Sequence, residues 1–150
     1  MDSELILTYK VDWPADDLNV FLRSWQEGKT NRRLRQVNFV MCSERNVKEV
    51  LKGLGGELMD PRTTKLKIRE DSLYGYEDKW ICGGIHIRRN DERLAVINGY
   101  KHSEEDENAD ERDIQEYLNE REMWNSEESS WLKEAFVVYI FPPSSSLKED

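Results

Sequence analysis

The first third of the chain alternates between a hydrophobic pattern with the period of a strand and one with the period of a helix. Loose alternation predicts strands at 5–11 and 34–42. Hydrophobic positions at i, i+3, i+4 and i+7 predict one helix between Pro14 and Gly28, and a second helix that Ser43 caps and a glycine pair ends. These positions are Leu18, Phe21, Leu22 and Trp25 in the first helix, and Val47, Val50, Leu51 and Leu54 in the second. We expect both sets to face one core.

The middle of the chain has the short strands and turn signals of an antiparallel sheet. We expect strands at 65–68, 79–88 and 94–97, with turns at 89–92 and 98–99. Between the first two strands, 72–78 is expected to be a loop. Gly83 and Gly84 are expected to mark a bulge or a close approach within the second strand.

The last third begins with an acidic and almost wholly polar segment, 103–110, which we expect to be an exposed loop. Asn108 with Glu111 has the spacing of a capping box and predicts that a charge-rich helix follows. A short helix is expected around Trp131. The segment 136–141 has the β-branched and aromatic composition of a closing strand.

Together these elements predict an α+β fold with a β-α-β-α opening, an antiparallel sheet in the middle, and a C-terminal acidic helix followed by a closing strand. The length of 150 residues suits a single domain. We therefore expect one domain over 1–143, with 103–110 as its exposed acidic loop, and a flexible tail over 144–150.

The charge is unevenly distributed along the chain. The net charge of the whole chain is −9. Residues 103–134 hold thirteen acidic and three basic residues, a net of −10, so the rest of the chain is close to neutral at +1. Within that neutral body, basic residues cluster at 29–35 and at 62–69. The sequence thus indicates a bipolar protein with one acidic region and two basic ones.

Few residues in the sequence offer catalytic or metal-binding chemistry. Cys82 and His86 are four apart on an expected strand, and Cys42 and His102 are distant from them, so the close ligand pair of a zinc site is missing. Cys82 with His102 could form a Cys–His pair, but a buried thiol is the more common state of a free cysteine. The glycines at 53–56 follow a predicted helix, whereas phosphate-binding loops precede one. We therefore predict no catalytic residues, no metal and no cofactor.

The composition favours a soluble protein inside the cell. Two cysteines do not make a disulfide framework. No apolar run reaches the length of about 18 residues that spans a membrane, and the first residues lack the basic cluster of a signal peptide. We expect a cytoplasmic protein without a membrane partner, and the sequence leaves its oligomeric state open.

The acidic region leads to the first functional hypothesis. A row of carboxylates on a helix can imitate a phosphate backbone and bind a basic surface. The candidate contact residues are Glu104, Glu105, Asp106, Glu111, Glu116, Glu120 and Glu127. Small size, acidity, five tryptophans and the missing catalytic motif resemble the composition of bacterial immunity proteins and phage inhibitors. We therefore expect a non-enzymatic binding or inhibitory protein with a basic protein partner. A solvated helix face that only aids solubility is the simpler interpretation.

The two basic clusters lead to a second hypothesis, an RNA-binding or single-stranded nucleic-acid-binding module. Cations that follow the phosphates, beside aromatic rings that stack on bases, are typical of such modules. The candidate residues are Arg32, Arg33, Arg35, Lys65, Lys67, Arg69, Tyr74 and Tyr76. The simpler interpretation is a solvated sheet face whose edge lysines discourage aggregation. A third hypothesis, an uncharacterised hydrolase, rests on no motif.

Overall fold

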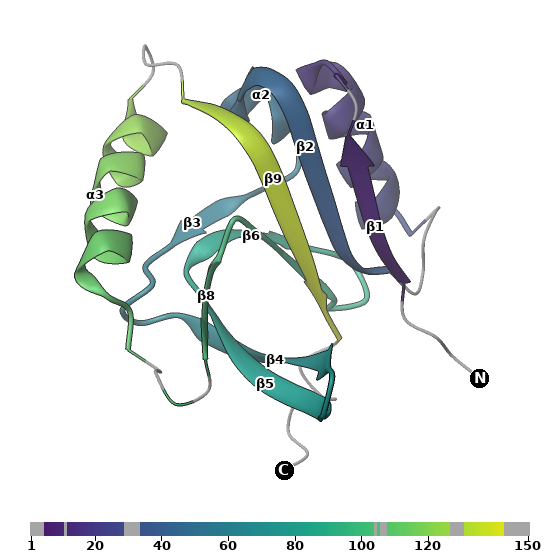
Figure 1. Ribbon diagram of the computed structural model, residues 1–150. Helices are drawn as coiled ribbons and strands as arrows, with labels where there is room; N and C mark the ends of the chain where they lie inside the picture. Colours follow the sequence, from purple (N-terminus) through teal and green to yellow (C-terminus); the bar gives the residue numbers. More distant parts are fainter. Residues whose placement is uncertain are drawn as a thin grey trace.

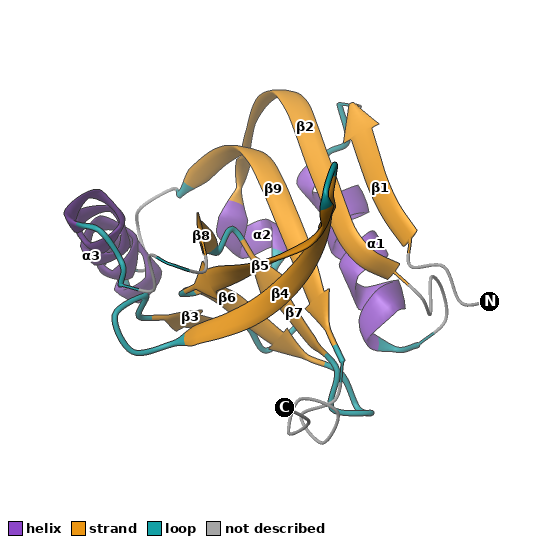
Figure 2. Ribbon diagram, turned by 60° about the horizontal axis from the view of Figure 1, so that its bottom comes forward, coloured by secondary structure: helices purple, strands orange, loops and turns teal. Residues whose placement is uncertain are grey.

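The described residues form a stack of helices and two β-sheets. The computed structural model describes residues 5–10, 12–28, 34–103, 105, 108–126 and 131–142. Over these residues the fold is mixed α+β, with three helices and two sheets whose strands are mostly antiparallel. Two of the helices pack on one face of a six-stranded sheet, and a three-stranded sheet lies across the other face (Figures 1 and 2). The expected α+β class is confirmed.

The element order places the last strand in the middle of the larger sheet. In chain order the elements are β1 (Leu5–Lys10), α1 (Ala15–Gln26), β2 (Leu34–Asn46), α2 (Val47–Val50), β3 (Glu57–Met59), β4 (Lys65–Ser72), β5 (Gly75–Cys82), β6 (Gly84–Arg88), β7 (Leu94–Ile97), β8 (Tyr100–Ser103), α3 (Glu111–Asn125) and β9 (Leu132–Phe141). The six-stranded sheet has the order β1-β2-β9-β7-β6-β3 and the three-stranded sheet the order β4-β5-β8. Strands β1 and β2 run parallel, and the other described pairs are antiparallel.

The larger core lies between α1, α2 and the six-stranded sheet. Alternation along β2 turns Val37 and Phe39 toward the helices, and the same alternation turns Phe136 and Val138 of β9 to that side. Buried residues of the helical region are Leu18, Leu22, Trp25, Val47, Val50, Leu51 and Leu54. Phe21 packs half-buried against this core. The two predicted sets of helical positions therefore do share one core.

A smaller core joins the two sheets. Ile68 of β4 and Ile81 of β5 pack against Val96, Tyr139 and Phe141 of the six-stranded sheet. Because side chains alternate along a strand, β7 and β9 supply residues to both cores. One face of the three-stranded sheet is thus held by the core, and its outer face is left for α3 and for solvent.

A glycine corner carries the chain from one sheet to the other. Strand β5 ends at Cys82 in the three-stranded sheet, and β6 begins at Gly84 in the six-stranded sheet. Gly83 and Gly84 have φ angles of +65° and +83°, in a region that residues with a Cβ rarely adopt. The prediction of one strand over 79–88 is therefore wrong, because these two residues break it into strands of different sheets.

Two predicted helix caps are also wrong. Strand β2 pairs with β9 up to Val40 and, after an irregularity, again at Arg45 and Asn46, so Asn46 instead of Ser43 caps α2, which is only 4 residues long. Asp110 instead of Asn108 caps α3. The expected helix around Trp131 does not continue beyond Trp131, because β9 begins at the next residue, Leu132, and Trp131 packs in the core. Residues 127–130 of that expected helix lie outside the described residues.

Helix α3 stands apart from the other two helices, beside β3 and β8 (Figure 1). Tyr117 is its buried residue, and Met123 and Trp124 at its C-terminal end pack, partly buried, against the larger core. None of the helices in the described part of the chain is long and apolar enough to cross a membrane. The predicted tail, 144–150, lies outside the described residues, as do positions 104, 106 and 107 of the predicted acidic loop.

Candidate functional site

The β4–β5 hairpin is built more tightly than the sequence predicts. Its strands pair in continuous register over all 8 residues of each strand. Leu73 and Tyr74 alone form the turn, and Gly75 follows with a φ of +117°. The predicted loop at 72–78 is therefore wrong, because a glycine in this conformation lets the chain reverse within two residues.

Alternation along the hairpin separates an apolar inner face from a basic outer face. Strand β4 turns Leu66 and Ile68 toward the core between the sheets. Lys65, Lys67 and Arg69 consequently lie on the opposite face, where all three are exposed. The three cations predicted on this strand are thus brought together on one surface, which we call the basic face.

Aromatic rings from β5 lie against the cations of the basic face. The Nζ atoms of Lys65 and Lys67 are 4.9 and 5.0 Å from the centroid of the Trp80 ring. The guanidinium carbon of Arg69 is 5.6 Å from the centroid of the Tyr76 ring. Since an exposed cation–π contact stabilises by about 0.5–1 kcal/mol, these contacts hold the three cations in a row along β4.

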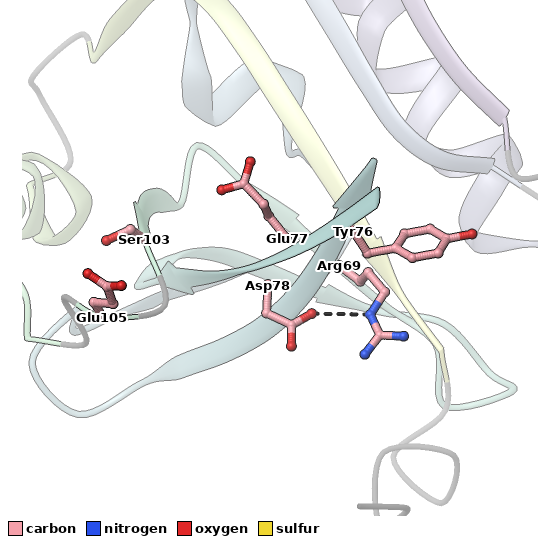
Figure 3. A pocket seen from close by; sticks show the side chains of 6 residues that line it. All are labelled: Arg69, Tyr76, Glu77, Asp78, Ser103 and Glu105. Atoms are coloured by element: carbon pink, nitrogen blue, oxygen red, sulfur yellow. Dashed lines mark hydrogen bonds and ion pairs between the residues drawn. The ribbon is translucent and has the colours of Figure 1, made fainter. Parts of the chain in front are cut away.

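The surface is hollowed at the Arg69 end of the basic face. The hollow has a volume of about 670 Å³ and is lined by Arg69, Tyr76, Glu77, Asp78, Ser103 and Glu105 (Figure 3). Arg69 Nε lies 3.2 Å from Asp78 Oδ1, and the Tyr76 ring points away from Asp78 (Figure 3). Because carboxylates outnumber the cation here, the charge is mixed at this end of the face and basic at the Lys65 end.

The tip of the hairpin exposes large hydrophobic side chains. Leu73 is 95% exposed, Tyr74 99% and Tyr76 70%. The other exposed large hydrophobic residues of the described surface are Val20, Val40 and Leu132. Three of these six exposed hydrophobic residues therefore lie within the segment 73–76, at the tip of the hairpin. A concentration of this kind marks interaction surfaces, whereas single exposed hydrophobic residues are ordinary.

The second basic cluster does not join the basic face. Arg32 and Arg33 lie outside the described residues. Arg35 is half-buried on β2, a strand of the six-stranded sheet. Where the chain is described, the candidate nucleic-acid-binding set is therefore divided between two sheets, and the hairpin holds its larger part.

The candidate acidic residues are also divided. Glu104, Asp106 and Glu127 lie outside the described residues, whereas Glu105 and Glu111 are exposed. Glu116 and Glu120 face the sheets. Tyr100 Oη of β8 lies 3.3 Å from Glu116 Oε2 and 3.4 Å from Glu120 Oε1. Lys133 Nζ of β9 lies 2.9 Å from Glu120 and 3.7 Å from Glu116. These two carboxylates therefore hold α3 against the sheets.

Glu120→Gln is expected to flatten the pH dependence of folding stability. Burial raises the pKa of the Glu120 carboxyl above its ordinary value of 4.5, and Lys133 offsets only part of this shift. The folded state therefore keeps a proton that the unfolded chain has lost. The free energy of unfolding consequently falls as pH rises from 4.5 through the raised pKa, by at most about 1.4 kcal/mol per pH unit for this group.

Urea unfolding at a series of pH values measures this slope. The variant should show a shallower slope than the wild type in that window. Glu122→Gln is the control, because it makes the same substitution at an exposed position of the same helix. Equal slopes for the wild type and Glu120→Gln would contradict the burial of this carboxyl.

His102 forms a second polar attachment for α3. Its Nε2 atom lies 2.8 Å from Asp113 Oδ2, and the two side chains are 8% and 18% exposed. Burial, with a further contribution from Asp110, raises the pKa of Asp113 despite the neighbouring histidine. Cys82 is buried, and the described His, Cys, Asp and Glu residues form no group of three that could hold a metal ion. The role that the geometry supports for His102 is docking of α3.

The amino-terminal part of the chain is similar to a known family. The family model described as F-box associated matches residues 1–39, a segment that includes β1, α1 and the first residues of β2. The matched segment does not reach the hairpin or α3. No curated protein and no solved structure matches the chain. Fold and surface thus define an α+β domain with a projecting, partly hydrophobic hairpin.

Proposed function

We propose that this chain is a non-enzymatic protein-binding module whose contact region is the tip of the β4–β5 hairpin. The observation that carries the proposal is the exposure of Leu73, Tyr74 and Tyr76 at the end of a strand pair anchored in the core between the sheets. Aromatic side chains on a preorganised element are typical of binding hot spots, because they lose little conformational freedom on contact. The match of residues 1–39 to an F-box associated family supports an interaction role.

A single-stranded nucleic acid is the second candidate, because the basic face combines Lys65, Lys67 and Arg69 with aromatic rings. Base stacking needs an open ring face. The two lysines lie over Trp80 and the arginine lies over Tyr76, so cations already occupy ring faces that bases would use. A protein partner therefore fits the hairpin better.

The acidic side of α3 is the third candidate surface, with a basic partner in the manner of immunity proteins and phage inhibitors. Glu111 and Glu122 are exposed there, whereas Glu120 faces Lys133. Arg112 is also exposed on the same helix, as is Arg121. Because both signs of charge lie along the exposed helix, its field on a basic partner is reduced. We therefore rank α3 below the hairpin.

Tyr74→Ser is expected to weaken binding of the partner by at least about tenfold, as removal of a hot-spot aromatic does. A photoreactive residue at position 74 first identifies the bound protein by crosslinking in cells. The affinity of that purified protein for the wild type and for Tyr74→Ser is then measured by calorimetry. The melting temperature should stay unchanged, because Tyr74 is 99% exposed and contributes little to the core.

Val20→Ser is the matched control, since Val20 is a hydrophobic residue 62% exposed on α1, away from the hairpin. It should leave the affinity unchanged. If Glu111→Lys with Glu122→Lys weakens binding and Tyr74→Ser does not, the contact belongs to α3 and the proposal is overturned. Crosslinking of position 74 to RNA instead of protein would also overturn it.

A further inference from the structure

We propose that the partner contributes an extended acidic segment that pairs with the outer edge of β4 and becomes a fourth strand of the three-stranded sheet. This inference rests on the proposed function and adds the chemistry and the binding geometry of the partner. In strand addition, backbone hydrogen bonds supply affinity and alternate side chains supply specificity. Strand β4 offers a regular backbone edge for the hydrogen bonds and an alternating row of side chains for the specificity.

The strand order leaves β4 at one margin of its sheet. The order is β4-β5-β8, and within the described residues β5 is the strand paired with β4 (Figure 2). The opposite margin is β8, which has only 4 residues, and its Tyr100 and His102 contact α3 on the outer face of the sheet. Strand β4 is 8 residues long and pairs with β5 without a bulge, so its outer edge is a regular template. An added strand therefore has one suitable margin on this sheet.

The alternation of β4 specifies the side chains of an added strand. Every second residue of that strand would lie beside the row of Lys65, Lys67 and Arg69, where a carboxylate is favoured and a cation is not. The intervening residues would lie on the inner face beside Leu66, which is half-buried, and Ile68. The complementary segment therefore alternates acidic residues with uncharged ones.

A second copy of this chain is a poor occupant of the same edge. Antiparallel pairing of β4 with β4 about Ile68 would place Lys67 of each copy opposite Arg69 of the other, and like charges opposite each other destabilise a strand pair. A nucleic acid lacks the peptide backbone that an open strand edge hydrogen-bonds. Charge and backbone chemistry together thus favour a different protein with an acidic strand.

Three peptides of the length of β4, 8 residues, serve as probes. The first alternates glutamate and threonine and has blocked ends. The second replaces each glutamate by lysine. The third keeps the acidic sequence but carries N-methyl groups on its central backbone nitrogens, which removes hydrogen-bond donors without changing charge. Fluorescence anisotropy measures their binding to the wild-type chain, and hydrogen exchange reports on the amides of β4.

We expect the acidic peptide to bind at least about tenfold more tightly than the other two. Its affinity should fall as salt rises toward about 0.3 M, because exposed charges are screened at that ionic strength. Lys67→Glu should weaken it by about tenfold. Lys52→Glu should not, since Lys52 is an exposed cation in the turn after α2. Exchange of β4 amides should slow on binding.

Equal binding of the acidic and N-methylated peptides would overturn strand addition, and equal binding of the acidic and basic peptides would overturn the acidic partner. If none of the three peptides binds, both strand addition and the acidic partner are overturned. The same conclusion follows if a single-stranded RNA of similar length binds more tightly than the acidic peptide. If position 74 still crosslinks to a protein partner in that case, the proposed function is supported and only the inference of an acidic added strand fails.

Discussion

Replacing Phe39 by alanine is expected to lower the free energy of unfolding by about 3–5 kcal/mol. Phe39 is 2% exposed on β2, and its ring lies at the centre of an aromatic cluster. The ring centroid is 5.5 Å from that of Tyr9, 5.7 Å from that of Trp13 and 5.2 Å from that of Phe21. The substitution leaves a cavity against a central strand, which cannot move to fill it because β1 and β9 pair with both of its edges.

Urea unfolding of the variant measures this loss, with two comparisons. Phe21→Ala removes a ring from the same cluster but from a half-buried position on α1, so a smaller loss is expected. Val20→Ala changes an exposed neighbour and should stay within about 0.5 kcal/mol. A larger loss at Phe21 than at Phe39 would mean that the cluster is centred on the helix and that the face assigned to β2 is wrong.

Periodicity alone predicts the packing of α1. An amphipathic helix on a sheet has one buried face, and Leu18, Leu22 and Trp25 occupy that face at the predicted spacing. The end of β2 shows the limit of such reasoning. Ser43 has the chemistry of a helix cap, yet β2 pairs with β9 again beyond it, at Arg45 and Asn46. A strand end that depends on a partner far away in the sequence is not contained in the local pattern.

The division into two sheets is likewise hidden in the sequence. The segment 79–88 reads as one continuous strand, and only Gly83 and Gly84 interrupt it. Two glycines in a strand are compatible with a bulge, a close approach or a change of sheet. The choice between these depends on the pairing of β6 with β7 and of β5 with β8, which are contacts between segments distant from the glycines.

The sequence predicts the cations of the basic face but not their contacts with aromatic rings. Alternation correctly places Lys65, Lys67 and Arg69 on one side of a strand. Their contacts with Trp80 and Tyr76 depend on the register between β4 and β5, which composition does not contain. That register decides whether the rings are open to bases or covered by cations.

Charge counting likewise treats every carboxylate of α3 alike. It cannot distinguish the exposed Glu111 from Glu120, which faces Lys133 and Tyr100. Leu73 was missed for a related reason. In a loop an apolar residue has no expected orientation, whereas a two-residue turn at the end of a rigid hairpin projects it into solvent.

Gly84→Ala is expected to lower the free energy of unfolding by about 2–4 kcal/mol, from overpacking of about 1–3 kcal/mol and a left-handed backbone cost of about 1 kcal/mol. Gly84 has a φ of +83° at the corner between the two sheets. A Cβ there would lie 2.8 Å from Val96 Cγ1 and 2.9 Å from the backbone of Gly99. Gly99 joins β7 of one sheet to β8 of the other. A backbone shift at Gly99 that makes room for the Cβ would therefore move strands of both sheets.

Gly55→Ala separates the two contributions to this loss. Gly55 has a φ of +70°, so the substitution carries a similar backbone cost, but a Cβ there meets no atom within 4 Å. It should cost only about 1 kcal/mol. Thermal and urea unfolding of both variants gives the difference, which measures the close approach of Gly84 to Gly99 and Val96. Equal losses at the two glycines would show that the corner is loosely packed, and the two sheets would then not be held in the close contact that positions the hairpin.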